Sequence, residues 1–198
     1  MSGSIETKVL DKVKRNPRGV LFFVDSFAVI ANAKAVNKAL ERLVKSGELE
    51  RVATGIYVRP VNDDYIGKVL PGIEEIAVAI AKRDRATLVP TGSYAMYKLG
   101  LTSQAPLNIV FYSDTSARKI KIGKQTITFK KASSKNLAFV GEISMLAIQA
   151  LRTIGKDKAT DEEIKQIKKI LKTENPKHLR HDLQLAPVWI RKLIMTNE

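Results

Sequence analysis

The sequence DSFAVIANAKAVNKALERLVKSGELERVATGIYVRP, residues 25–60, decides the fold of the N-terminal part of the chain. Apolar residues recur in it at helical spacing, and these are Val36, Leu40, Leu43 and Val44. The spacing predicts a helix over 34–45, and Gly47 stands where a helix end favours a left-handed residue. Upstream, Asp25-Ser26 can cap a short helix over 27–30. The pattern therefore predicts two helices joined by a short turn.

The residues on either side of these two helices complete the pattern of a known domain. Residues 48–53 and 56–59 flank the turn residues Thr54-Gly55, which predicts a hairpin. An amphipathic helix is expected over 5–15, and a short apolar strand over 20–24. The order helix, strand, helix, turn, helix, hairpin is that of a winged helix-turn-helix. We therefore predict a DNA-binding domain over residues 1–60.

The rest of the chain is predicted to be a second domain, over 72–198, after a polar linker over 61–71. It begins with helices and strands in alternation, which we expect over 73–82, 94–99, 107–112 and a hairpin over 119–131. It ends in helices, which are expected over 142–154, over 161–171, after Asn175-Pro176 and after Ala186-Pro187. Thr160 and Glu163 form a capping box at the start of the helix over 161–171. The predicted fold class is α+β: a winged helix-turn-helix followed by a mixed α/β domain that ends in a helical bundle.

Composition limits the classes of function. The chain has 198 residues, with 34 Lys and Arg against 20 Asp and Glu, a formal net charge of +14 that favours a polyanionic partner. It contains no cysteine, which excludes disulfides and thiolate zinc sites. Its N-terminus, MSGSIETKVL, has no signal-peptide pattern, and no apolar run reaches the ~18 residues of a membrane span. We expect a cytoplasmic protein with no membrane partner.

Double-stranded DNA is the partner that the N-terminal domain predicts. A helix-turn-helix places the start of its second helix against base edges in the major groove. The candidate residues there are Asn32, Lys34, Asn37, Lys38 and Arg42. Asn pairs with adenine and Lys or Arg with guanine, so Asn37, Lys38 and Arg42 are the candidate base readers and Lys34 a phosphate contact. In the wing, the candidates are Arg51, Thr54, Gly55 and Arg59. Some winged helices bind protein instead, which is the alternative interpretation.

A second basic stretch lies in the C-terminal domain. Residues 116–135 carry seven basic residues and no acidic one. Six of them form a possible auxiliary nucleic-acid patch: Arg118, Lys119, Lys121, Lys124, Lys130 and Lys131. The alternative is a solvated edge hairpin whose lysines discourage strand aggregation. The alternation of apolar and polar residues agrees equally with both interpretations.

We expect no catalytic residues, no metal and no cofactor. Gly92-Ser93 before a helix resembles the phosphate-binding loop of nucleotidyltransferases, which also need paired carboxylates on the next strand. The strand expected over 107–112 has none, and the first carboxylate after it is Asp114. His178 and His181 are spaced like zinc ligands on a helix, with Asp182 adjacent, but no further ligand accompanies them.

Many short matches make the chain similar to one bacterial family. Its N-terminal part resembles the winged-helix domain of AbiEi-type antitoxins of abortive-infection systems, through ALERL at 39–43, Gly47, Arg51 and Gly55-Ile56-Tyr57. The second half is similar in 76–84, Pro90-Thr91-Gly92 with Ala95, Leu99-Gly100-Leu101, Gln104-Ala105-Pro106 and the hairpin over 118–130.

The resemblance implies an antitoxin of a type IV toxin–antitoxin system that represses its own operon by binding operator DNA. It also implies a functional partner, a nucleotidyltransferase-like toxin, and leaves open whether antitoxin and toxin touch. Two other functions are kept as alternatives. One is an interaction module that neutralises a toxin by direct contact through the C-terminal helices, and the other is a non-catalytic nucleotide- or RNA-binding protein.

Overall fold

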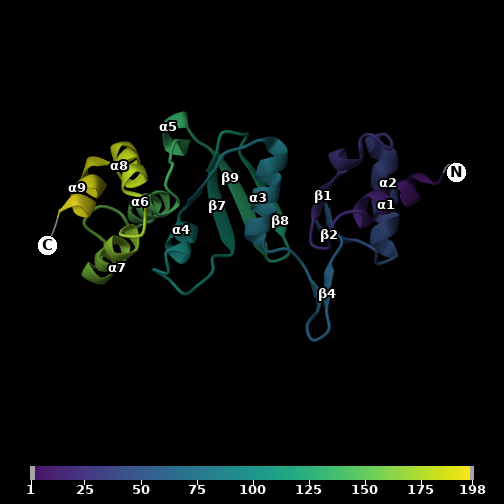
Figure 1. Cartoon of the computed structure of the whole chain (residues 1–198), viewed down its shortest axis with the longest axis horizontal. Helices are drawn as coiled ribbons and strands as arrows, with labels where there is room; N and C mark the ends of the chain where they lie inside the picture. Colours follow the sequence, from purple (N-terminus) through teal and green to yellow (C-terminus); the bar gives the residue numbers. More distant parts are fainter. Residues whose placement is uncertain (1–2, 197–198) are drawn as a thin grey trace. The chain divides into compact units, whose positions relative to one another are not determined.

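The computed structural model describes residues 3–196 and divides into two compact units (Figure 1). The first unit contains the described residues up to Ile80 together with Lys121–Gly123, and the second contains the remainder. The predicted α+β class is confirmed. N-terminal helices accompany two small sheets, and a mixed four-stranded sheet precedes C-terminal helices. Among the described residues, no helix is long and apolar enough to span a membrane.

The first unit has the element order of a winged helix. Its elements are α1 (Ile5–Lys14), β1 (Leu21–Phe23), the 3₁₀ helix η1 (Val24–Phe27), α2 (Ala33–Lys45), β2 (Glu50–Ala53) and β3 (Ile56–Val58). The strands form an antiparallel sheet in the order β1-β3-β2. The core joins the apolar stripes of both helices, and its fully buried members include Val9, Val13, Val36 and Leu40. Burial of each such side chain stabilises the fold by about 1.5–3 kcal/mol.

The predicted helix over 27–30 is wrong in position and type. The structure has a single 3₁₀ turn at Val24–Phe27, followed by hydrogen-bonded turns up to α2. Ser26 does not cap a helix that follows it, because its Oγ accepts a hydrogen bond from the Phe23 amide upstream (3.1 Å). Phe27 is completely buried and packs on Phe22, with 5.8 Å between ring centroids. The need to bury Phe27 therefore fixes a tighter turn than the sequence indicated.

The segment predicted as a linker contains a second hairpin. Strands β4 (Val61–Asp63) and β5 (Gly67–Val69) pair antiparallel, with Val61 opposite Val69. Asp63 closes the turn, because its Oδ1 accepts hydrogen bonds from the Tyr65 and Ile66 amides (2.9 and 3.0 Å). These bonds favour the carboxylate and lower the pKa of Asp63 below its ordinary value.

The second unit is built on a four-stranded sheet in the order β6-β7-β9-β8, although Lys121 and Ile122 at the end of β8 are grouped with the first unit. Its strands are β6 (Leu88–Thr91), β7 (Asn108–Ser113), β8 (Arg118–Ile122) and β9 (Gln125–Lys131). Strand β6 pairs antiparallel with β7, whereas β7 and β9 run parallel. The helices are α3 (Ile73–Asp84), which begins in the first unit, α4 (Ser93–Lys98), α5 (Ser134–Leu137), α6 (Glu142–Ile154), α7 (Asp161–Leu171), α8 (Pro176–Leu185) and α9 (Val188–Met195).

Strand β9 differs from the expected one-sided hairpin strand. The sequence alternation predicts that Thr128 faces solvent, but Thr128 is buried between the buried Ile127 and Phe129. Its hydroxyl donates to Asn108 Oδ1 (2.8 Å). Successive strand residues face opposite sides of the sheet, so the burial of all three residues shows that both faces are covered here, and the hydroxyl needs this partner.

Helix α6 lies at the centre of the C-terminal helices and has an unusual N-terminus. Its N-cap, Gly141, has no side chain to accept from the first-turn amides. Two distant carboxylates do so instead. Asp182 accepts from the amides of Val140 and Gly141 (3.0 and 2.9 Å), and Glu174 accepts from those of Ile143 and Ser144 (2.9 and 3.1 Å). Negative charge also suits the positive end of the helix dipole.

Candidate DNA interface

Helix α2 presents a basic face on the side opposite its core stripe. The α-helix turns about 100° per residue, which places Lys34, Lys38 and Lys45 together, opposite Val36 and Leu40. All three lysines are exposed. We call these three residues the α2 basic face. Exposed ammonium groups in a row along a helix can meet the phosphates that border a DNA groove.

The sequence prediction missed two members of this surface. Lys45 was left out because the prediction ended at Arg42, although the spacing of Lys45 from Lys34 and Lys38 places it on the same face. Glu41 is exposed there too, so the face also carries a carboxylate. An acidic side chain at this position repels phosphate and favours contact with a base that donates a hydrogen bond, such as cytosine.

Asn37 and Arg42 lie on opposite flanks of α2, about 140° apart around the helix axis. Asn37 is half-buried, and Arg42 forms an exposed ion pair with Glu6 of α1, with 3.6 Å between Nη1 and Oε2. The three predicted base readers therefore do not share one face, and Lys38 is the one that points directly away from the core.

Asn32 is the N-cap of α2. Its Oδ1 accepts a hydrogen bond from the Ala35 amide (3.0 Å), and the helix begins at Ala33, one residue before the predicted start. This bond occupies the side-chain oxygen that adenine recognition would use. The structure thus gives Asn32 a role in fixing where the helix begins.

Replacing Asn32 by Ala is expected to lower the free energy of unfolding by about 1 kcal/mol, because the Ala35 amide loses its acceptor. Urea denaturation at neutral pH measures this change. Asn32→Asp is the matched control, since its carboxylate can accept the same bond at the positive helix end. Equal losses in both variants would contradict the capping role.

The wing is a tight hairpin. Thr54 and Gly55 form its turn, with Gly55 at a φ of 73°, where a side chain would be strained. Arg51 and Thr54 are exposed. Arg59 is half-buried with its Nε below the surface, and its carbonyl accepts from the Gly19 amide (2.9 Å). In this short wing, the side chains of Arg51 and Thr54 are therefore more accessible to a DNA molecule than that of Arg59.

Val29 is a candidate that the sequence did not reveal. It lies in the turn before α2 with 89% of its surface exposed. An exposed valine beside the start of a recognition helix can contact the methyl group of thymine. The sequence alone indicates that Val29 is a core residue, because it belongs to a run of apolar residues.

Of the six predicted patch residues on the β8–β9 hairpin, the five lysines are exposed and Arg118 is not. Arg118 is two-thirds buried and forms an ion pair with Asp84, and its guanidinium lies 5.0 Å from the centre of the Phe129 ring. Burial of Asp84 raises the pKa of its carboxyl, but hydrogen bonds and charge from Arg83 and Arg118 outweigh burial and lower it. The five lysines are exposed: Lys119, Lys121, Lys124, Lys130 and Lys131.

The remaining residues singled out in the sequence have local structural contacts. Asp114 accepts a hydrogen bond from the Thr87 amide (3.0 Å). His181 Nδ1 lies 2.9 Å from Asp182 Oδ1, and His178 Nδ1 lies 3.8 Å from Glu174 Oε1. Within residues 3–196, no group of three or more His, Cys, Asp or Glu side chains is placed to hold a metal ion.

Together these features define an α+β protein of two units, with a winged-helix element order and an exposed basic helix in the first. A family profile matches residues 8–179, and the chain belongs to this family, which is described as a family of unknown function (DUF6088). A comparison with curated proteins gives no match. Among solved structures, the chain is similar to the RV2827C protein from Mycobacterium tuberculosis, at 12% identity and a TM-score of 0.47. That similarity covers 98% of this chain and 82% of the other.

Proposed function

We propose that this chain is a sequence-specific DNA-binding protein that represses its own operon and acts as the antitoxin of a toxin–antitoxin pair. The observation that carries the DNA-binding part is the α2 basic face, exposed on the helix that follows the turn of a winged-helix arrangement. In such domains this helix enters the major groove. The net charge of +14 adds a general attraction to phosphate.

The division of labour follows from the positions of the side chains. Lys34, at the start of α2, suits a phosphate contact, and Lys38 suits a guanine in the groove. Arg51 and Thr54 of the wing suit the DNA backbone beside that groove. Val29 adds an apolar contact in front of the helix.

The antitoxin part rests on the resemblance to AbiEi-type antitoxins, which extends over both halves of the chain. It assigns the chain a nucleotidyltransferase-like toxin as its functional partner. Protection can be tested by expressing the chain together with the nucleotidyltransferase-like protein encoded beside it, where the genome has one. Rescue of growth supports the assignment, and continued growth arrest in the presence of folded antitoxin contradicts it.

Fluorescence anisotropy on the chain's own upstream DNA and on a scrambled duplex, at several salt concentrations, tests DNA binding directly. Preference for the native sequence that survives at high salt supports a sequence-reading repressor. Equal and steeply salt-dependent binding to both duplexes would show that the charge meets phosphates without reading bases, and would contradict the proposal.

Replacing Lys34 and Lys38 together by Ala is expected to weaken binding to the upstream DNA by about tenfold to 100-fold. Since Lys34 is the proposed phosphate contact and Lys38 the proposed base contact, the plot of log K against log salt should become shallower by about one. Lys156→Ala with Lys177→Ala is the matched control, since it removes the same charge from exposed positions of the second unit. Equal losses in the two double variants would show that net charge, and not α2, governs binding.

A further inference from the structure

The β4–β5 hairpin, residues 61–69, is an arm whose tip is unusually exposed. Tyr65 is 97% and Ile66 is 76% exposed, and the loop extends away from the three-stranded sheet of its unit (Figure 1). Two contacts hold the base of the arm. Lys68 pairs with Glu50 of β2, and Arg18 donates to the Pro60 carbonyl (2.8 Å). Two-stranded ribbons are marginally stable alone, so an arm kept in this form suits a contact with another surface.

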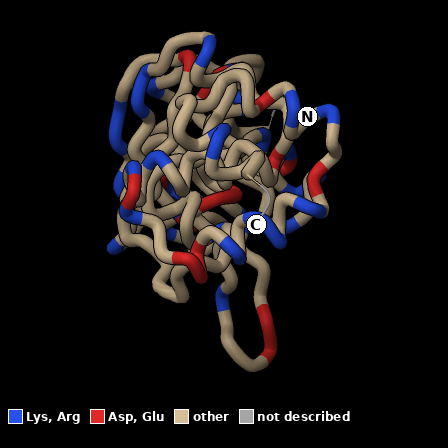
Figure 2. The backbone as a smooth tube through the Cα atoms, turned by 90° about the vertical axis from the view of Figure 1, so that its left-hand side faces the viewer, with Lys and Arg blue, Asp and Glu red and all other residues tan. Residues whose placement is uncertain are grey.

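The chemistry of the tip does not suit DNA. Asp63 and Asp64 precede Tyr65 and Ile66, and Figure 2 shows acidic residues along this loop. Carboxylates repel phosphates, whereas they attract lysines. The Asp63 carboxylate already holds the turn through hydrogen bonds from two backbone amides, so the tip loses little conformational freedom when it binds a partner. The tip thus offers an exposed carboxylate on Asp64 beside an aromatic and an aliphatic side chain.

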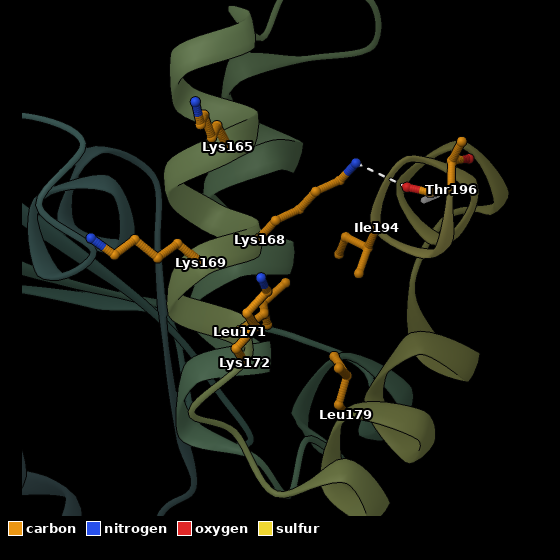
Figure 3. A pocket seen from close by; sticks show the side chains of 8 residues that line it. All are labelled: Lys165, Lys168, Lys169, Leu171, Lys172, Leu179, Ile194 and Thr196. Carbon is orange, nitrogen blue, oxygen red and sulfur yellow. Dashed lines mark hydrogen bonds between the residues drawn. The ribbon is translucent and has the colours of Figure 1, made fainter. Parts of the chain in front are cut away.

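A groove of complementary character lies among the C-terminal helices (Figure 3). It has a volume of about 790 Å³, and four lysines of α7 and its C-cap line it: Lys165, Lys168, Lys169 and Lys172. Its apolar lining comes from Leu171, Leu179 and Ile194. Lys168 is held across the groove by a hydrogen bond to the Thr196 carbonyl (3.0 Å). Among the described residues that line the groove, none is acidic.

We propose that the arm of one copy of this chain docks into the lysine-lined groove of a second copy. Asp64 then faces the lysines, while Tyr65 and Ile66 cover the apolar lining formed by Leu179 and Ile194. Charge complementarity selects this occupant, because an acidic tip with two apolar side chains meets a basic rim with an apolar floor. Each copy carries both surfaces, and the proposal includes a second, equal contact that closes a symmetric dimer.

Charge reversal tests the docking in solution, without DNA. The wild-type chain is expected to form a dimer of twice its 22.0 kDa mass in sedimentation equilibrium, and the dimer weakens as salt rises. Asp64→Lys and Lys172→Glu are each expected to weaken it about tenfold or more, because each places like charges together. Asp11→Lys, an exposed reversal on α1, is the matched control and leaves the dimer unchanged. Tyr65→Ser is expected to weaken it without a change in charge.

Mixing the variants gives the decisive result. A chain with Asp64→Lys and a chain with Lys172→Glu restore opposite charges at one contact and keep the native pair at the other. Equimolar mixing should therefore recover a heterodimer of near wild-type affinity. A monomeric wild type overturns the proposal. The proposal is also overturned if the mixture stays monomeric while a single chain that carries both Asp64→Lys and Lys172→Glu dimerises, because the arm would then contact the groove of its own copy. Loss with Asp64→Lys but not with Lys172→Glu also overturns it, since the arm would then bind elsewhere.

Discussion

Replacing Asp182 by Asn is expected to lower the free energy of unfolding by about 3 kcal/mol, more than any surface change in this chain. Asp182 is completely buried and accepts four hydrogen bonds, from the Val140 and Gly141 amides, from Ser144 Oγ (2.5 Å) and from His181 Nδ1 (2.9 Å). Each carboxylate oxygen faces one backbone N–H. An Asn side chain must therefore turn its NH₂ group toward an N–H in either orientation, and one amide at the start of α6 loses its acceptor.

Urea denaturation at neutral pH measures this loss, and Asp157→Asn is the matched control. Asp157 is highly exposed and has a φ of 58°, a conformation that Asn also tolerates, so the control should change stability by less than about 0.5 kcal/mol. Similar stabilities of Asp182→Asn and the wild type would show that Asp182 contributes little to the start of α6.

The same network predicts how stability depends on pH. Burial raises the pKa of Asp182, but hydrogen bonds from Ser144, His181 and the two amides outweigh burial and lower it below the ordinary 3.8. The pKa of Glu174 is lowered in the same way. Burial raises this pKa, but hydrogen bonds from backbone amides and the charge of His178 outweigh burial and lower it below 4.5.

A lowered pKa in the folded state means that the stabilisation is present above the unfolded-state pKa and lost as the pH falls through the folded-state value. The wild type should therefore lose stability below about pH 4 more steeply than Asp182→Asn. Unfolding free energies measured from pH 7 down into this acidic range would reveal the difference. Parallel profiles would mean that Asp182 titrates alike in both states.

The elements predicted correctly are those with signals close together in the sequence. Helix α2 has a continuous apolar stripe, and α7 has a capping box that the structure confirms, with Thr160 Oγ1 accepting from the Glu163 amide (3.2 Å) and Glu163 from the Thr160 amide (2.8 Å). Strand β6 was missed because it contains Pro90, which argues against a strand except at a sheet edge, where β6 lies. The arm was missed because Asp63 and Asp64 indicate a polar linker, whereas Asp63 in fact closes a turn.

The candidate DNA interface was predicted at the level of the helix but not of its side chains. The stripe Val36, Leu40 and Leu43 fixes which side of α2 is buried, yet the prediction chose residues by their distance from the helix start. Arg42 consequently seemed available, although Glu6 from another helix pairs with it. The roles of Asp182 and Glu174 had no local signal, because they act on amides 30 or more residues away. Pairings across such separations depend on tertiary structure alone.

Replacing Gly141 by Ala is the second change with a large expected effect, again about 3 kcal/mol. A Cβ at this position would lie 2.3 Å from Ser144 Oγ and 2.6 Å from Glu174 Oε2. Side-chain ends usually move away at little cost, but these two are fixed by their hydrogen bonds, Ser144 to Asp182 and Glu174 to the first-turn amides. The added methyl group must therefore break the bonds that cap α6 or shift the backbone. Gly141 is required for space and not for its φ, which is −98°.

Gly72→Ala is the control for this substitution, since a Cβ there would meet Glu75 Oε2 at an ordinary 3.6 Å. The control should leave stability unchanged or raise it slightly, by reducing the freedom of the unfolded chain. A double-mutant cycle with Ser144→Ala then identifies the cause. Ser144→Ala removes the nearest clashing atom, so Gly141→Ala should cost clearly less in that background than in the wild type. Additive losses would place the strain in the backbone, and the capping carboxylates would then not explain why residue 141 must be glycine.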